Sequence, residues 1–306
     1  MANILVIAGP TAVGKSALSL ELARRLNGEI ISADSMQIYR GMDIGTAKAT
    51  LDERQSIVHH LIDIKDPSEE YSCADYGVDA RRCMEDILSR GKVPIFCGGT
   101  GLYIRQALCE SPVASPPSDP ELRAALEQRS IEENYAELCE CDPESAQSIH
   151  PNNARRVIRA LEIFRLSGIP KSQWDRDNPS EEYRSDALLL CLTAPREQLY
   201  DRIDRRVNVM MEQGLYEEVA GLNLDPTTTA GQAIGYKEML GCFNGELTIP
   251  EAVSQIQLAS RRYAKRQLTW FRHQKGFTML DVSQFANFEE IVNFVVNLFE
   301  KSKSML

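Results

Sequence analysis

Hydrophobic positions along the chain form two alternating patterns. Short, continuous apolar runs are typical of strands buried on both faces of a sheet, and they occur at Ile4–Ala8, Val93–Cys97 and Leu188–Leu192. Glu29–Ser35 and His59–Ile64 are two further predicted strands. Apolar residues at helical spacing follow at Ala17–Leu26, Tyr76–Arg90, Pro195–Ala220, Glu251–Lys275 and Phe288–Leu298. This alternation predicts an α/β fold, a parallel sheet flanked by helices, with Leu188–Leu192 as its last strand.

One long segment departs from this alternation. The stretch 111–120 is rich in proline and serine and is typical of a linker. It is followed by Glu121–Trp174, which is helical in pattern throughout. We therefore expect an all-helical domain at 115–185, inserted into an α/β domain formed by 1–114 and 186–306.

The composition is that of an ordinary globular protein of 306 residues with a formal net charge of −10. The negative total does not exclude nucleic acid, because binding follows local patches. The eight cysteines form no C-x-x-C pair and the four histidines show no zinc spacing, which favours reduced thiols and a cytoplasmic protein. The first strand begins almost at Met1 and no apolar run is long enough for a bilayer, so we expect neither a signal peptide nor a membrane segment.

A glycine-rich loop with the pattern G-x-x-x-x-G-K-[ST] joins the first strand to the first helix. Its residues are Gly9, Pro10, Thr11, Ala12, Val13, Gly14, Lys15 and Ser16. Backbone N–H groups of such a loop and the positive end of the following helix bind phosphate oxygens. We expect Lys15 to reach the terminal phosphate and the Ser16 hydroxyl to ligate Mg²⁺. The sequence thus predicts a P-loop NTPase-like core that binds a polyphosphate.

Two strand ends supply candidate residues near this loop. Asp34 ends the second predicted strand, and the carboxyl ends of strands line the ligand crevice of an open α/β sheet. The alternative for Asp34 is a turn or a helix cap. The strand at Val93–Cys97 runs into Gly98-Gly99-Thr100, where a P-loop NTPase usually presents an acidic residue. The glycines allow close approach of a ligand, and either the metal is held differently or no nucleotide is hydrolysed.

Basic residues cluster in three helical segments. The clusters are Arg155, Arg156 and Arg159 in the insertion, Arg202 and Arg206, and Arg261, Arg262, Lys265 and Arg266. Arginines interleaved with aromatic residues suit RNA phosphates and unstacked bases, and Arg206 also suits a diphosphate. The alternatives are a solvated face for the insertion arginines, carboxylate partners for Arg206, and core packing for the aromatic residues near Arg266.

Several motifs together resemble one family along almost the whole chain. They are the phosphate-binding loop at 9–16, DSMQIYRGMDIGTAK at 34–48, HHLID at 59–63, GGTGLY at 98–103, HPNNARRVIRALE at 150–162, AIGYKE at 233–238 and RRYAKRQLTWF at 261–271. In this order and spacing they are similar to bacterial tRNA dimethylallyltransferases, also called tRNA isopentenyltransferases. The phosphate-binding loop alone is shared by many unrelated proteins, whereas the full set is specific.

The resemblance implies transfer of a dimethylallyl group from dimethylallyl diphosphate to the N6 amine of the adenosine 3′ of the anticodon, in tRNAs that read codons starting with U. It implies catalytic roles for Asp34, Thr100 and Arg206, a diphosphate in the loop at 9–16, and Mg²⁺ on Ser16. The implied tRNA contacts are Asp34, Ser35, Met36, Gln37, Thr100, Arg123, Arg155, Arg156, Arg159, Gly235, Tyr236, Lys237, Arg261, Arg262, Lys265 and Arg266. The expected partners are the tRNA anticodon stem-loop and dimethylallyl diphosphate, and we expect a monomer.

Three alternatives remain open at the level of sequence. An adenylate isopentenyltransferase keeps the chemistry but uses a free nucleotide as acceptor. An ATP-dependent small-molecule kinase with a helical lid, or a non-catalytic nucleotide switch, also fits the loop. The basic clusters favour a large polyanionic acceptor over a free nucleotide.

Overall fold

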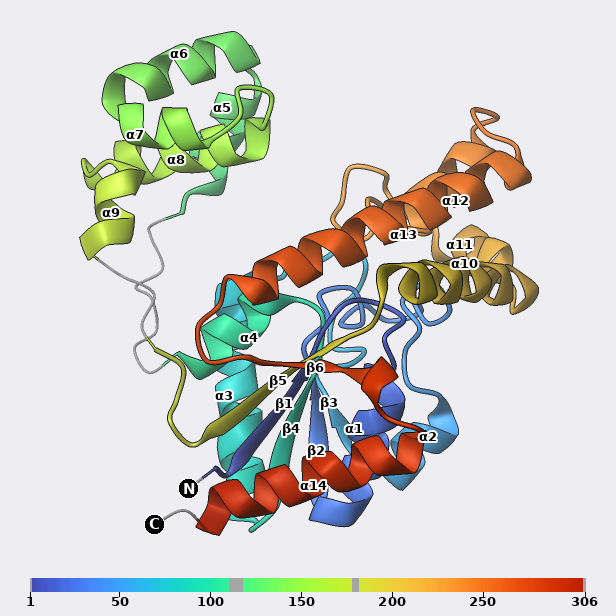
Figure 1. Ribbon diagram of the computed structural model, residues 1–306. Coiled ribbons are helices and arrows are strands. Elements are labelled where there is room, and N and C mark those ends of the chain that lie inside the picture. Colours follow the sequence, from blue (N-terminus) through green and yellow to red (C-terminus); the bar gives the residue numbers. More distant parts are fainter. Residues whose placement is uncertain (1, 110–117, 178–181, 305–306) are drawn as a thin grey trace. The chain divides into compact units, whose positions relative to one another are not determined.

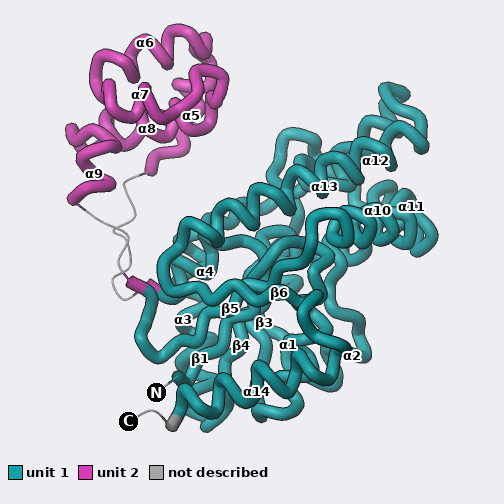
Figure 2. Tube along the Cα trace, viewed as in Figure 1, with its two compact units in different colours: residues 1–108, 183–306 teal, residues 109–182 magenta. Residues whose placement is uncertain are grey.

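The computed structural model describes residues 2–109, 118–177 and 182–304. It divides the chain into two compact units, one of Met1–Leu108 with Tyr183–Leu306 and one of Cys109–Glu182 (Figure 2). We call the first unit the core and the second the insertion. The insertion expected at 115–185 lies within a few residues of the second unit at both ends.

Within the described residues, the core is built on one parallel six-stranded sheet with the order β3-β2-β4-β1-β5-β6. The strands are β1 Ile4–Ala8, β2 Gly28–Ser32, β3 His59–His60, β4 Val93–Gly98, β5 Ala187–Thr193 and β6 Thr278–Asp281. Strand β1 lies between β4 and β5, and all of its residues are buried. Its unbroken apolar run is what a strand covered on both faces requires.

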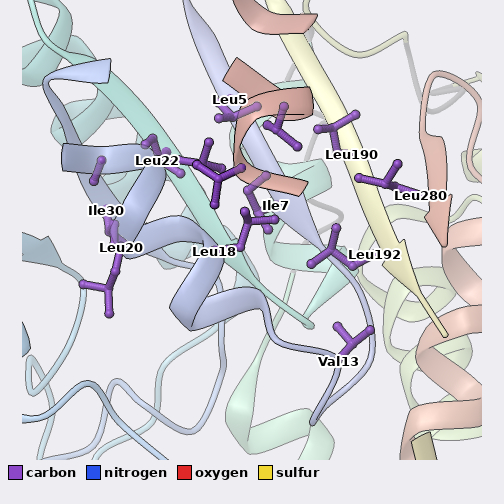
Figure 3. Close-up of a cluster of buried hydrophobic side chains, with 14 of the residues drawn as sticks. Leu5, Ile7, Val13, Leu18, Leu20, Leu22, Ile30, Leu190, Leu192 and Leu280 are labelled. Atoms are coloured by element: carbon purple, nitrogen blue, oxygen red, sulfur yellow. The ribbon is translucent and has the colours of Figure 1, made fainter. Parts of the chain in front are cut away.

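Helices cover both faces of the sheet (Figure 1). The core helices are α1 Lys15–Leu26, α2 Leu51–Ser56, α3 Cys73–Ser89, α4 Gly101–Leu108, α10 Arg196–Glu212, α11 Leu215–Leu222, α12 Tyr236–Phe243, α13 Ile249–Arg272 and α14 Phe288–Ser304, with a short 3₁₀ turn at Val282–Gln284. Leu5 and Ile7 of β1 pack on one side with α1 and α14, around Leu18 and Leu22 (Figure 3). Alternate β1 residues pack on the other side with α3 and α4. The alternation follows from the two-residue period of a strand.

A further apolar cluster lies between helices α10 to α13 and the loop after β2. It joins Tyr39 and Met42 of that loop to Val207, Met239 and Ile256. The loop that follows Asp34 is therefore anchored to α10–α13 by buried side chains. This packing matters for function because it fixes the loop at the carboxyl end of the sheet.

The insertion has its own small core. In its described part the helices are α5 Pro120–Glu127, α6 Ile131–Cys141, α7 Pro143–Ser148, α8 Ala154–Ser167 and α9 Lys171–Asp177. Leu126, Leu138, Val157 and Leu161 form its buried centre. The helical segment predicted to be continuous is thus broken into shorter helices. Three breaks fall at Ser130, Asp142 and Asn153, whose side chains cap the following helices, and the fourth falls at Gly168, where φ is 72°.

Three element predictions are wrong in detail. Leu188–Leu192 is not the last strand, because β6 pairs with β5 beyond it; β6 has too few residues to show a pattern. The strand predicted at His59–Ile64 stops at His60, since Leu61 and Asp63 adopt φ of 60° and 58° and turn the chain. The helix predicted at Pro195–Ala220 breaks at Gly214, where φ is 97°.

The core residues that flank the insertion, Leu108 before it and Arg184 after it, lie next to each other. The Arg184 N–H donates to the Leu108 carbonyl at 2.9 Å. The insertion therefore leaves and rejoins the core at neighbouring points, which is the usual arrangement of an inserted domain.

Candidate active site

The phosphate-binding loop has the backbone geometry that the sequence motif requires. Gly9, Ala12 and Gly14 adopt φ of 142°, 63° and 102°. A Cβ at Gly9 would lie 2.6 Å from the Leu192 carbonyl oxygen, so only glycine fits beside β5. The first turn of α1 has no side-chain cap and no acidic residue. Its N–H groups and the positive helix end are thus available to an anion.

Two cations converge on this loop. The Lys15 Nζ donates to the Pro10 carbonyl at 2.7 Å, and an Arg206 Nη donates to the Thr11 Oγ1 at 3.3 Å. Burial lowers the pKa of both Lys15 and Arg206, and the nearby Asp34 carboxylate partly opposes each decrease. Within the described residues neither cation makes an ion pair with a carboxylate. Two half-buried cations without a carboxylate partner, next to a helix N-terminus, form a site prepared for a polyanion.

Asp34 and Thr100 lie together at the ends of two neighbouring strands. Strands β2 and β4 pair up to Ser32 and Cys97. The Thr100 N–H then donates to the Ala33 carbonyl at 3.0 Å, and the Ser35 N–H donates to the Thr100 Oγ1 at 3.1 Å. The Asp34 Oδ1 accepts from the Met36 N–H at 2.9 Å, which fixes the carboxylate. The predicted catalytic residues Asp34, Thr100 and Arg206 therefore surround one end of the loop.

The glycines at the end of β4 and just after it make room for the protein itself. A Cβ at Gly98 would lie 2.1 Å from the Ala33 carbonyl oxygen, and one at Gly99 would lie 2.0 Å from the Gln267 Nε2. A Cβ at Gly101 would lie 2.2 Å from the Trp270 ring. These contacts give the glycines a structural role beside the predicted one, close approach of a ligand. The glycines let β4 approach β2 and α13 closely, which places Thr100.

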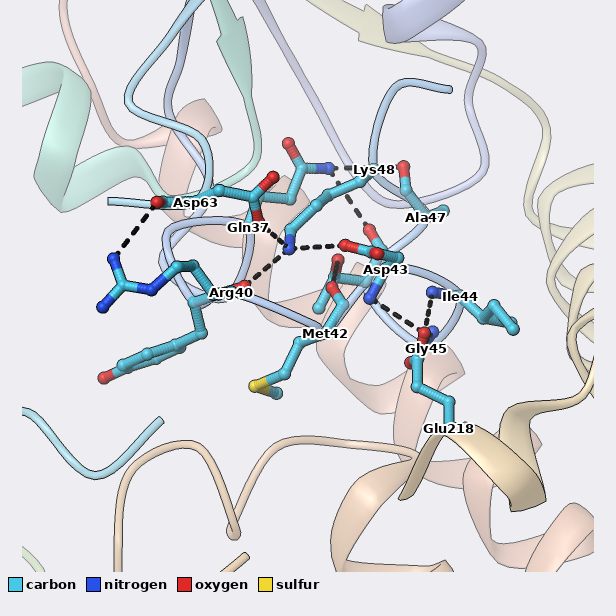
Figure 4. Close-up of polar contacts among 12 residues, drawn as sticks. Gln37, Arg40, Met42, Asp43, Ile44, Gly45, Ala47, Lys48, Asp63 and Glu218 are labelled. Carbon is cyan, nitrogen blue, oxygen red and sulfur yellow. Dashed lines mark hydrogen bonds and ion pairs between the residues drawn. The ribbon is translucent and has the colours of Figure 1, made fainter. Parts of the chain in front are cut away.

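The loop from Asp34 to Lys48 is held by polar contacts that sequence reasoning did not predict (Figure 4). The Lys48 ammonium is buried and contacts the Tyr39 carbonyl and the carboxylates of Asp43 and Asp63. The Glu218 carboxylate of α11 accepts from the N–H groups of Asp43, Ile44 and Gly45 at 2.7–3.1 Å. Glu218 thus binds three donors of this loop, and no local sequence signal pointed to it.

The predicted RNA-contact residues of this loop are all half-buried, but their hydrogen bonds differ. Ser35 and Met36 are half-buried beside Thr100. The Gln37 side chain instead bonds inward, accepting from the Ser32 hydroxyl at 2.9 Å and donating to the Thr46 carbonyl at 3.2 Å. Gln37 therefore braces the loop.

Helix α13 carries an exposed basic surface. Arg262, Lys265 and Arg266 are exposed, and the Arg266 guanidinium lies 5.5 Å from the Tyr263 ring centre. Arg261 differs, because it pairs with Asp204 of α10 at 2.6 Å. Burial, and after it the Asp34 charge, raises the pKa of Tyr263 to about 12, so its hydroxyl stays protonated beside Thr100.

Of the three residues predicted around α12, Gly235 and Tyr236 are buried and Lys237 is exposed. Gly235 adopts φ of 97° and its N–H donates to Glu238, while Lys237 lies 3.5 Å from the same carboxylate. The prediction that Tyr236 contacts RNA is wrong for its side chain. It has no exposed surface, and its hydroxyl donates to Glu218 at 2.5 Å.

In the insertion, the predicted arginines fall into two groups. Arg155 and Arg156 are exposed at the start of α8. Arg123 and Arg159 both pair with Glu162, whose side chain is fully buried. The second pair thus neutralises a buried carboxylate, which leaves Arg155 and Arg156 as the freer candidates for a polyanion.

Ser16 is the residue expected to hold a metal. It is exposed in the first turn of α1, next to the phosphate-binding loop. The described residues contain no group of three His, Cys, Asp or Glu side chains able to bind a metal ion. A single hydroxyl ligand fits Mg²⁺ bound mainly through phosphate oxygens and water.

Among the residues that the structure describes, no helix is long and apolar enough to cross a membrane.

The fold and the site define a P-loop α/β enzyme class in which the loop binds a phosphorylated substrate beside a carboxylate. The family profile described as IPP transferase matches residues 37–274, and one described as isopentenyl transferase matches 2–66. A tRNA dimethylallyltransferase of Anoxybacillus flavithermus is 47% identical over 97% of this chain and 96% of the relative. One of Bacillus mycoides is 48% identical over 96% and 94%. The chain belongs to the tRNA dimethylallyltransferase (IPP transferase) family.

Solved structures agree with this assignment. A full-length tRNA isopentenylpyrophosphate transferase from Bacillus halodurans matches with a TM-score of 0.73 and 42% identity, over 100% of this chain and 99% of the other. A eukaryotic dimethylallyltransferase, described as acting on tRNA, matches with a TM-score of 0.83 and 33% identity over 98% of this chain and 80% of the other.

Proposed function

We propose that this protein transfers a dimethylallyl group from dimethylallyl diphosphate to the N6 amine of the adenosine 3′ of the anticodon, in tRNAs that read codons starting with U. The observation that carries the proposal is the meeting of Asp34 with Lys15 and Arg206 at the phosphate-binding loop. A carboxylate base and two cations around a diphosphate site are what this transfer needs. The protein acts as a monomer in the cytoplasm.

The acceptor amine needs activation. The lone pair of an exocyclic adenine amine is delocalised into the ring, so the amine is a weak nucleophile. As its nitrogen forms a bond to the first carbon of the prenyl group, Asp34 takes the proton that the nitrogen loses. Thr100, next to Ser35, positions the base beside Asp34. The adenosine reaches this site flipped out of the anticodon loop, which is cheaper than flipping from a duplex.

The leaving group is stabilised at the loop. As the bond between carbon and diphosphate oxygen breaks, the diphosphate gains negative charge. The loop N–H groups, Lys15 and Arg206 face that charge and stabilise it in a half-buried site. Ser16 is the residue that would hold Mg²⁺, which when bound supplies further charge neutralisation to the diphosphate.

The anticodon stem-loop is held by phosphate contacts. Arg262, Lys265 and Arg266 present exposed cations on one helix, and Arg155 and Arg156 do so in the insertion. Cations that neutralise phosphates release counterions, so binding weakens steeply with salt. The formal net charge of −10 is compatible with this, because the basic residues are grouped.

The direct test incubates the protein with labelled dimethylallyl diphosphate, Mg²⁺, and either unmodified tRNA or AMP. Label on the tRNA adenosine is the expected result. Label on AMP alone would instead support an adenylate isopentenyltransferase, and consumption of ATP with a small acceptor would support a kinase. No label on tRNA rejects the proposal.

Asp34→Asn separates catalysis from binding. The amide cannot accept the proton, so we expect the transfer rate to fall by about 10²–10⁴-fold while the stem-loop affinity changes little. Asp52→Asn, on the exposed first turn of α2, is the matched control and keeps the wild-type rate. Equal losses of rate and affinity in Asp34→Asn would assign Asp34 a structural role.

A further inference from the structure

One buried glutamine joins the two loops of the site. Gln267 of α13 is 6% exposed. Its Oε1 accepts from the Thr11 N–H at 3.0 Å, and its Nε2 donates to the Gly99 carbonyl at 3.0 Å. Thr11 belongs to the phosphate-binding loop, and Gly99 precedes Thr100. A single side chain therefore spans the diphosphate site and the acceptor site.

A side-chain amide satisfies both partners at once. The Thr11 N–H needs an acceptor and the Gly99 carbonyl needs a donor, and a side-chain amide offers one of each at a fixed separation. The reverse amide orientation leaves both backbone groups unpaired, so the bonding network settles the orientation. The missing Cβ at Gly99 completes the fit, because any Cβ there would meet the Gln267 amide at 2.0 Å.

The same helix also presents the basic surface. Tyr263 lies one turn before Gln267 and faces Asp34 and Thr100, while Lys265 and Arg266 are exposed between them. The buried face of α13 thus contacts both substrate loops, and its exposed face carries the cations proposed for RNA. A rigid helix with these two faces links RNA contact to the geometry of the site.

We propose that Gln267 is a positioning residue that couples the donor site to the acceptor site, so that bound diphosphate and bound RNA strengthen each other. This rests on the proposed function for the identity of the two substrates. The amide holds Thr11 and Gly99 at a fixed distance, which sets the prenyl carbon in line with the amine beside Asp34. Losing the amide lets the loops move independently.

The test compares Gln267→Met, Gln267→Glu and wild type, with Gln257→Met as the matched control. Methionine keeps the length and apolar character of the side chain but removes both hydrogen bonds. Gln257 lies on the same helix, and its amide nitrogen donates to two groups of α10, the Asp204 carbonyl and the Asn208 Oδ1. Thermal unfolding first confirms that each variant is folded at the assay temperature.

The coupling is measured with inorganic diphosphate plus Mg²⁺ and a synthetic anticodon stem-loop. The affinity for diphosphate is determined with and without the stem-loop. In the wild type we expect the stem-loop to raise that affinity by roughly 5-fold or more, within the usual range of coupling between sites. In Gln267→Met the factor falls below about 2-fold, and in Gln257→Met it stays at the wild-type value. A wild type without coupling, or a Gln267→Met protein that retains it, overturns the proposal.

The transfer rate at saturating substrates gives a second readout. Misplacement of the reacting atoms by about 1 Å lowers the rate of Gln267→Met by about 10²-fold. In Gln267→Glu, the ionised carboxylate has no proton to donate to the Gly99 carbonyl. The protonated carboxyl group can donate to the Gly99 carbonyl and accept from the Thr11 N–H, as the amide does. The rate of Gln267→Glu relative to wild type therefore rises as the pH falls, and a constant ratio would contradict the proposal.

The two proposals fail separately. A wild-type protein that transfers no prenyl group to tRNA rejects the function, and the diphosphate and stem-loop titrations still decide the coupling. An active wild type whose Gln267→Met variant matches it in rate and coupling rejects the inference alone.

Discussion

Gly98→Ala tests whether the close contact between the ends of β2 and β4 sets the catalytic geometry. The new Cβ would lie 2.1 Å from the Ala33 carbonyl oxygen, whereas real Cβ contacts are essentially never under 3.0 Å. The two strand ends must therefore separate by roughly 1 Å, and the bond from the Thr100 N–H to the Ala33 carbonyl is lost or lengthened. Overpacking and the weakened bond together cost about 2–4 kcal/mol of stability.

The same displacement separates Thr100 from Asp34. A misplacement of about 1 Å lowers an enzymatic rate by about 10²-fold, so the transfer rate of Gly98→Ala falls that far at saturating substrates. The stem-loop affinity stays near the wild-type value, since the exposed cations of α13 are untouched. Single-turnover transfer and a filter-binding titration measure the two quantities.

The chain suits a clean stability assay. It has two tryptophans, Trp174 in the insertion and Trp270 in the core. In a Trp174→Phe background, the fluorescence of Trp270 reports unfolding of the core alone by urea. Gly221→Ala is the control, because a Cβ there meets nothing within 4 Å; it gains up to about 1 kcal/mol and keeps its rate. A Gly98→Ala protein with wild-type rate and stability would refute the reasoning.

Three further outcomes are expected. The substitution Tyr236→Phe lowers the free energy of unfolding by about 1–2 kcal/mol in the wild type, because it removes the hydrogen bond from the Tyr236 hydroxyl to Glu218. In a Glu218→Ala background that bond is already absent, so the loss is much smaller. A double-mutant cycle measured by urea unfolding checks this, and equal losses in the two backgrounds contradict it. Hydrogen bonding to Arg90 holds the pKa of Glu29 in the folded protein well below its usual range. The ionised Glu29 carboxylate therefore stabilises the fold fully above about pH 4.5, and this stabilisation is lost as the pH falls towards the pKa of the folded protein. The gap in urea midpoint between wild type and Glu29→Gln therefore narrows on acidification, and a constant gap contradicts it. Arg266→Ala lowers the slope of stem-loop affinity against salt by about 1, and an unchanged slope would assign Arg266 to packing.

The parts of the site that the sequence predicts are those encoded locally. The loop at 9–16 and Asp34 could be placed because each follows an apolar strand directly, and in a parallel sheet the strand ends gather at one edge. Their spacing along the chain therefore carries the geometry. The insertion was visible for the same reason, since a long helical pattern interrupts the alternation of strands and helices.

The parts that the sequence does not predict depend on partners far along the chain. Gln267 and Thr11 are 256 positions apart, and Glu218 lies more than 170 positions from the N–H groups that it binds. No local pattern encodes such pairs. One signal was present: Gln267 occupies the apolar stripe of α13 with Ala264 and Phe271, where a polar side chain needs buried partners. The sequence shows which residues are basic, but it does not show that Arg261 pairs with Asp204 of α10. Nor does it show that the Tyr236 side chain is buried.

The position of the insertion has a consequence for synthesis on the ribosome. Strand β1 pairs with β4 on one side and with β5 on the other, and β5 follows the insertion. At about 5–20 residues per second, roughly 70 intervening residues take several seconds to emerge. During that time one edge of the most apolar strand stays unpaired, which is a known risk for aggregation. The insertion has its own buried centre, and the core residues on either side of it, Leu108 and Arg184, are hydrogen-bonded to each other. Strand β5 therefore emerges close to the edge of β1 with which it pairs.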